Sequence, residues 1–177
     1  MKRQLIGMTC GGISALALLA GCSDAPAEPN PHRAASPAAS AGQAEAPQSS
    51  KAAVADHVKT VMEGRLSPDE TRFGSGTGSP CSTSSAGMFT AKCGSAAKAT
   101  GADASFALEQ IERHEGFATL RDVAEKLRIA VTRYQQLGCA DNPTEAATRH
   151  ACLEPAALIA QGFPDLRGGA NLGLRGA

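Results

Sequence analysis

The sequence predicts an all-α protein: a small antiparallel bundle of four to five helices that follows a disordered N-terminal tether. Over residues 51–164, apolar side chains recur at intervals of three and four, which is the spacing of one face of a helix. No stretch of strand length alternates apolar and polar residues, as a half-buried β-strand would. Helices whose apolar faces must be covered within one short chain pack as a bundle.

The first half of this region predicts helices on either side of a loop. A helix is expected at 51–63, where Gly64 ends it. The glycine- and serine-rich stretch that follows holds two cysteines, and a short helix is expected within it around 86–98. The next helix is expected at 104–115, because Asp103 is a good N-cap and the apolar residues after it share one side.

The second half carries the strongest helical pattern, at 120–137. Its apolar residues are Leu120, Val123, Leu127, Ala130, Tyr134 and Leu137. This spacing is typical of the seam of an antiparallel bundle or a short coiled coil. Packing within the chain is favoured over a dimer interface, because the other helices also need an apolar partner. Further helices are expected at 143–152 and from Pro155 to Gln161, with Gly162 as the stop, before a glycine-rich tail at 165–177.

The N-terminal residues have the layout of a secretory signal peptide. Lys2 and Arg3 are followed by a short apolar stretch from Ile13 to Ala20 and then by small residues. The apolar stretch is too short for a transmembrane helix, which needs roughly 20 consecutive apolar residues. The segment therefore predicts export.

Residues 19–22 read Leu-Ala-Gly-Cys, which resembles the lipobox of bacterial lipoproteins. The resemblance implies that residues 1–21 are removed and that Cys22 receives a diacylglyceryl group on its thiol. Two or three acyl chains would hold a protein stably on a membrane, whereas one chain binds reversibly. The alternative is an ordinary signal peptide in which Cys22 is incidental.

Residues 23–50 predict the tether. Their five prolines recur without a period, and none of their side chains is both larger and more apolar than alanine. Such a segment cannot bury enough apolar surface to offset its ordering entropy. The expected organisation is a signal peptide at 1–21, the lipidated cysteine and tether at 22–50, a helical domain at 51–164 and the tail at 165–177.

The six cysteines divide by position. Cys10 belongs to the signal peptide and Cys22 to the lipobox, which leaves Cys81, Cys93, Cys139 and Cys152. An even number of cysteines in an exported domain implies two disulfides, with three connectivities open. We favour Cys81–Cys93 and Cys139–Cys152, because each closes a short local loop. The alternative is a metal site of Cys139, His150 and Cys152, although this spacing matches no common zinc signature.

The sequence predicts no catalytic, cofactor-binding or metal-binding residue. The 17 Lys+Arg balance the 17 Asp+Glu and aromatic residues are only 3%, so the footprint of a nucleic-acid-binding protein is missing. The glycine-rich run at 74–79 fits neither a nucleophile elbow nor a phosphate loop and is interpreted as a flexible surface loop. His32 lies in the tether, and His57 and His114 lie near the polar faces of expected helices.

The chain also resembles small lipoproteins of high-GC actinobacteria such as streptomycetes, in its Ala/Gly/Arg-rich composition and in the runs FATLRDVAEKL, YQQLGC, TRHACL and LIAQGFPDLRGGANLGLRG. The resemblance implies the extracytoplasmic face of the cell membrane. In a cell with two membranes, Ser23 after Cys22 would instead imply the periplasmic face of the outer membrane. We expect a non-enzymatic domain that binds an envelope protein, a wall polymer or a small ligand. An extracytoplasmic hydrolase or transferase, whose site assembles only in the fold, is the alternative.

Overall fold

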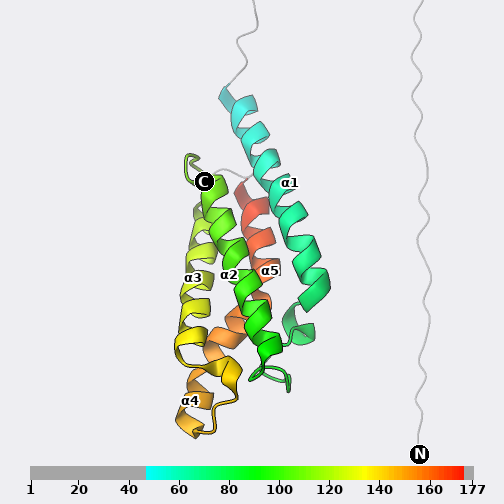
Figure 1. Cartoon of the computed structure of the whole chain (residues 1–177). Helices are drawn as coiled ribbons and strands as arrows, with labels where there is room; N and C mark the ends of the chain where they lie inside the picture. Colours follow the sequence, from blue (N-terminus) through cyan, green and yellow to red (C-terminus); the bar gives the residue numbers. More distant parts are fainter. Residues whose placement is uncertain (1–46, 174–177) are drawn as a thin grey trace, which may run out of the picture. The chain divides into compact units, whose positions relative to one another are not determined.

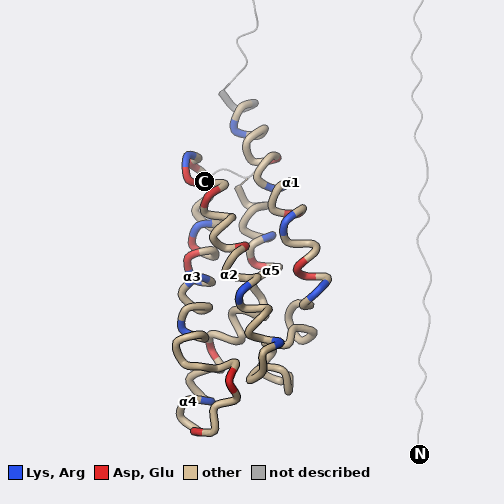
Figure 2. The backbone as a smooth tube through the Cα atoms, in the orientation of Figure 1, with Lys and Arg blue, Asp and Glu red and all other residues tan. Residues whose placement is uncertain are grey.

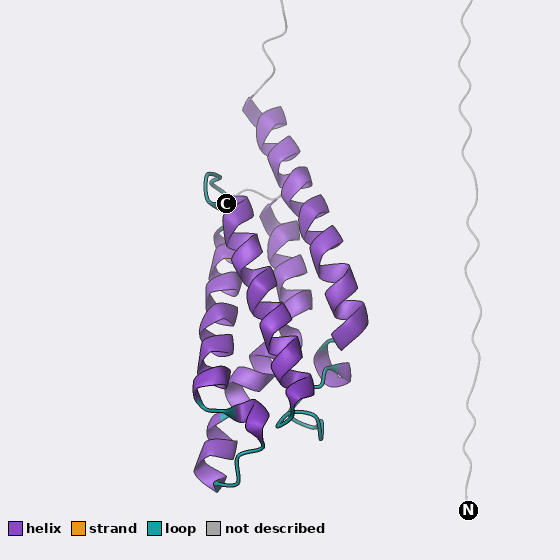
Figure 3. Cartoon of the chain, in the orientation of Figure 1, coloured by secondary structure: helices purple, strands orange, loops and turns teal. Residues whose placement is uncertain are grey.

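The computed structural model describes residues 47–173, and all regular structure in this range is helical (Figure 3). The elements are α1 (Pro47–Phe73), a 3₁₀ turn (Gly76–Gly78), α2 (Ala91–Ile111), α3 (Ala118–Gln136), a 3₁₀ turn (Cys139–Asp141), α4 (Ala146–Ala151) and α5 (Leu153–Leu172). The predicted all-α bundle is confirmed. The predicted signal peptide with Cys10, the predicted lipobox with Cys22 and most of the predicted tether lie outside the described residues.

Four long helices build the bundle, and consecutive ones run in opposite directions (Figure 1). Helix α3 packs against both α2 and α5, while α1 packs against α5 and α2. The short α4 lies beside the first turns of α5. This arrangement leaves the end of α1, the start of α2 and the loop between them together at one end of the bundle (Figure 1).

The core consists of two clusters of buried side chains. One joins α1 to the other long helices and includes Val58, Met62, Leu66, Ile111, Leu120, Leu127, Phe163 and Leu166. The other surrounds the four cysteines and includes Met88, Val131, Tyr134 and Ile159. The seam predicted in the strongest helix supplies both clusters, since Leu120 and Leu127 belong to the first and Tyr134 belongs to the second. That helix, α3, is confirmed to within two residues at each end.

Helix α1 is longer than the predicted helix at 51–63. It begins at Pro47 and continues to Phe73, so neither Gly64 nor Pro68 ends it. Leu66, two residues after the expected stop, is completely buried and extends the apolar stripe of the helix. Pro68 cannot donate a hydrogen bond to the Gly64 carbonyl and its ring crowds that carbonyl, but both residues are exposed, so water can reach the freed carbonyl.

The predicted helices around 86–98 and at 104–115 are one helix, α2. The actual N-cap is Thr90, whose hydroxyl oxygen accepts a hydrogen bond from the Lys92 N–H at 3.3 Å. Asp103 does not cap a helix, because its carboxylate is buried in mid-helix and accepts a hydrogen bond from Arg65 of α1 at 2.6 Å. Local capping rules cannot predict a partner that lies 38 residues away in the sequence.

The end of the chain also differs from the prediction. The helix expected at 143–152 is shorter, Ala146–Ala151, and α5 continues through Gly162 to Leu172, so much of the predicted tail is helical. Gly162 serves close packing instead of ending the helix. A Cβ placed there would lie 2.5 Å from the Thr100 Cγ2 atom of α2. Glycine at this position therefore allows α5 to approach its neighbour.

Candidate functional site

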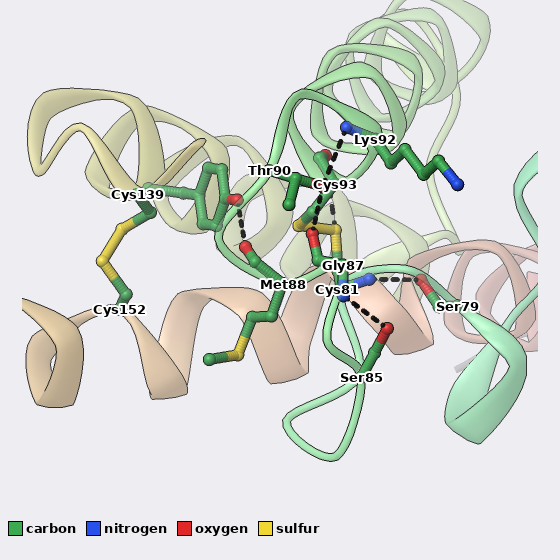
Figure 4. The surroundings of a disulfide bond; sticks show 11 residues. Ser79, Cys81, Ser85, Gly87, Met88, Thr90, Lys92, Cys93, Cys139 and Cys152 are labelled. Atoms are coloured by element: carbon green, nitrogen blue, oxygen red, sulfur yellow. Dashed lines mark hydrogen bonds between the residues drawn. A yellow bond between two sulfur atoms is a disulfide. The ribbon is translucent and has the colours of Figure 1, made fainter. Parts of the chain in front are cut away.

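Two disulfides cross-link the bundle at the end where α1 stops and α2 begins. Cys81 is bonded to Cys93 and Cys139 to Cys152, which are the pairs favoured from the sequence (Figure 4). All four cysteines are completely buried. The first disulfide joins the loop before α2 to the first turn of that helix. The second joins the turn after α3 to the residue before α5.

The disulfides exclude the alternative metal site, because both of its sulfur atoms are bonded to each other. His150 is exposed on the short α4. Among residues 47–173, no group of three or more His, Cys, Asp or Glu side chains is placed to hold a metal ion. His57 and His114 are likewise exposed and lie on separate elements, while His32 lies outside the described residues.

The segment 74–90 is a series of hydrogen-bonded turns, although the glycine-rich run 74–79 within it predicts a flexible surface loop. Backbone N–H groups along it donate to carbonyls three residues earlier, in a chain that ends with Thr90 donating to Gly87 at 3.0 Å. Gly74 starts the segment with φ +68°, and a Cβ there would lie 2.7 Å from the Gly78 carbonyl oxygen. The buried Tyr134 hydroxyl donates to the Met88 carbonyl at 2.5 Å (Figure 4). We call this segment the stapled loop.

A cavity of about 590 Å³ lies between the end of α1, the stapled loop and the first turns of α2. It is lined by Arg72, Phe73, Thr77, Gly78, Ser79, Pro80, Ser85, Gly87, Lys92 and Ser95. These residues comprise two cations, four hydroxyl groups and an apolar wall, with no carboxylate and no imidazole. We call this cavity the basic pocket.

The two cations of the basic pocket are not neutralised by the protein. Neither Arg72 nor Lys92 belongs to an ion pair within residues 47–173. The Arg72 guanidinium lies 4.9 Å from the centroid of the neighbouring Phe73 ring. Lys92 lies in the first turn of α2, where the positive end of the helix dipole adds to its charge. The pocket therefore has a positive potential.

Two serine hydroxyls of the basic pocket accept hydrogen bonds from the backbone. The Ser79 Oγ accepts a hydrogen bond from the Cys81 N–H at 3.2 Å, and the Ser85 Oγ accepts one from the Gly87 N–H at 3.0 Å (Figure 4). Within the described part of the chain, neither hydroxyl hydrogen has an acceptor. Because a serine hydroxyl carries one hydrogen and two lone pairs, each hydrogen remains available to a ligand.

Two carboxylates of α1 are paired with an arginine of α5. The Arg167 guanidinium bridges Glu63 at 2.6 Å and Glu70 at 2.8 Å, which joins α5 to α1. The Arg167 hydrogen bond lowers the pKa of Glu63, and a hydrogen bond from Ser75 lowers the pKa of Glu70. These ion pairs hold helices together.

Asp103 is the one completely buried carboxylate among the described residues. Burial raises its pKa to about 6, and the hydrogen bond from Arg65 opposes that rise. Its second oxygen and the Thr100 hydroxyl have no hydrogen-bond partner in the described part of the chain. Arg65, Thr100 and Asp103 do not line the basic pocket. We therefore assign the Arg65–Asp103 pair to the packing of α1 on α2.

Sequence reasoning missed Arg72 and Lys92, although one signal marks them. Between Glu70 and Asp103 the chain has no acidic residue, while it holds these two cations and Lys98. Figure 2 shows this stretch without a red segment from the end of α1 into α2. A long acid-free run that contains cations and hydroxyl residues predicts a positive surface once the fold brings its ends together.

Comparison with protein-family models, with curated proteins and with solved structures finds no match for this chain. None of the described helices combines the length and the apolar character that crossing a membrane requires.

Proposed function

We propose that this protein is a lipid-anchored binding domain of the cell envelope, held on the extracytoplasmic face of the membrane through Cys22. The two buried disulfides are the observation that carries this proposal. Structural disulfides persist in oxidising compartments and are rare in the cytosol. They therefore support the export that the signal peptide and the lipobox predict.

The basic pocket supports binding as the domain's role. General acid–base catalysis most often uses His, and otherwise Asp, Glu, Lys, Tyr or Cys, within hydrogen-bond reach of the reacting atoms. The lining residues supply cations, hydroxyl groups and an apolar wall, and of those catalytic residue types they include only Lys92. Ligand sites typically have volumes of about 300–1,000 Å³, and this cavity of about 590 Å³ falls within that range. The disulfide beside the pocket keeps its walls in place before a ligand arrives.

The anchor is tested by replacing Cys22. Cells that express the protein are fed an alkyne-bearing palmitate analogue, and incorporation into the immunoprecipitated protein is measured. We expect the wild-type protein to be labelled and to sediment with membranes, because stable anchoring requires two or more acyl chains. The Cys22→Ala variant should lose the label and leave the membrane fraction.

Cys10→Ala is the matched control, since it removes a cysteine from the same N-terminal region and should leave the label unchanged. Labelling of the Cys22→Ala variant, or an unlabelled wild-type protein, would contradict the anchor.

A further inference from the structure

We infer that the basic pocket binds a phosphate monoester carried on a sugar-sized body. This inference rests on the proposed binding function and names the chemical class of its ligand. It is carried by three features of the pocket: its charge, its hydrogen-bond donors and its apolar wall.

The charge of the pocket matches a dianion. Arg72 and Lys92 contribute two positive charges, and no lining residue is acidic. The nearest acidic residues along the chain are occupied elsewhere, because Glu70 pairs with Arg167 and Asp103 pairs with Arg65. A phosphate monoester carries about −1.5 to −2 charges near pH 7. A carboxylate or a phosphodiester carries one negative charge and would leave the second cation without a partner.

The donors of the pocket match the acceptor oxygens of such a group. A terminal phosphate presents three strong acceptor oxygens. A guanidinium binds phosphate through parallel N–H donors, and an ammonium binds it as a point charge. The Ser79 and Ser85 hydroxyl oxygens already accept backbone N–H groups, so their free hydrogens are further donors. Donors from the stapled loop and cations from α1 and α2 thus surround one space.

The size and the wall of the pocket indicate what the phosphate is attached to. A cavity of about 590 Å³ is much larger than a bare phosphate ion. Phe73 and Pro80 form an apolar wall in this cavity, and both are half-buried. The carbon face of a sugar ring can lie against such a wall while its phosphate meets the cations. Thr77 and Ser95 add hydroxyl groups for the polar edge of the sugar.

The test is a calorimetric titration of the full-length protein, purified in mild detergent, with three compounds that share one ring. Glucose 6-phosphate carries the dianion, glucuronate carries a carboxylate at the same position, and glucose carries neither. The titrations are repeated on a variant with Arg72→Gln and Lys92→Gln. The matched control has Lys98→Gln and Arg128→Gln, which make the same change in net charge at exposed positions outside the pocket.

We expect glucose 6-phosphate to bind the wild-type and control proteins. Glucuronate should bind at least about tenfold more weakly and glucose not measurably, because each charged hydrogen bond contributes about one order of magnitude or more. The Arg72→Gln, Lys92→Gln variant should lose about a hundredfold in affinity for glucose 6-phosphate, with an unchanged melting temperature. Equal affinity in this variant, or no binding of glucose 6-phosphate by the wild-type protein, would overturn the inference.

Two further outcomes separate the ligand class from the proposed function. If glucuronate binds the pocket as tightly as glucose 6-phosphate, the phosphate assignment is wrong while the binding function stands. A lipid headgroup is tested with dihexanoyl phosphatidylglycerol, a water-soluble phosphodiester. If this lipid binds more tightly than glucose 6-phosphate, and does so through Arg72 and Lys92, the ligand is a membrane phosphodiester and the monoester is excluded.

Discussion

Replacing all four domain cysteines with serine should destabilise the domain by about 6 kcal/mol, which is enough to unfold many small domains. The two disulfides join residues 12 and 13 positions apart. In the chain-entropy description, a loop of this size contributes about 3 kcal/mol to the free energy of unfolding. The serine hydroxyls would also be buried where the sulfur atoms now lie, which adds a desolvation cost. Urea unfolding of the quadruple variant and of each double variant measures the effect.

The reductant provides the control for this prediction. Dithiothreitol should lower the unfolding midpoint of the wild-type protein and leave that of the quadruple variant unchanged. If removing each disulfide lowers the free energy of unfolding by less than about 1 kcal/mol, the bundle does not depend on its disulfides for stability.

Gly169→Leu should destabilise the protein by at least about 3 kcal/mol, whereas Gly168→Leu should not destabilise it. A Cβ at Gly169 would lie 2.8 Å from the Leu120 Cα atom of α3, so any side chain there must push two backbones apart. A Cβ at Gly168 would have nothing within 4 Å. Leucine at this exposed helical position should stabilise α5 by roughly 0.5–1 kcal/mol, because glycine is a poor helix former.

The neighbouring glycines are a matched pair, since the substitution is the same and only the facing surface differs. Urea unfolding of the two variants measures the free-energy difference between them. Equal effects of the two substitutions would contradict the close contact between α5 and α3.

Helix type and helix faces could be predicted from the sequence, whereas several helix ends could not. Gly116 and Gly138 lie just beyond helices and have positive φ values, +88° and +62°, as glycine stops do. Gly64 and Gly162 have the same local appearance but lie inside helices. Burial of Leu66 favours continuing the helix past Gly64, and the close contact with α2 requires glycine at position 162. Both reasons are tertiary, so local patterns do not contain them.

The cysteine pairs could be predicted because they are local in the sequence. The basic pocket could not, since it combines residues from α1, the stapled loop and α2 that belong to no known motif. The only local indication is the acid-free stretch from residue 71 to 102. Whether its cations remain unpaired depends on the pairing of Glu70 with Arg167, which is nearly a hundred residues away along the chain.

Peptide mass mapping of the protein, isolated from membranes without reduction, tests the proposal that this is a lipid-anchored domain with two disulfides. We expect an N-terminal peptide that begins at Cys22 and carries a diacylglyceryl group. We also expect one peptide pair linked through Cys81–Cys93 and another through Cys139–Cys152. An unmodified Cys22, a peptide that retains residues 1–21, or a link between the two cysteine pairs would contradict the proposal.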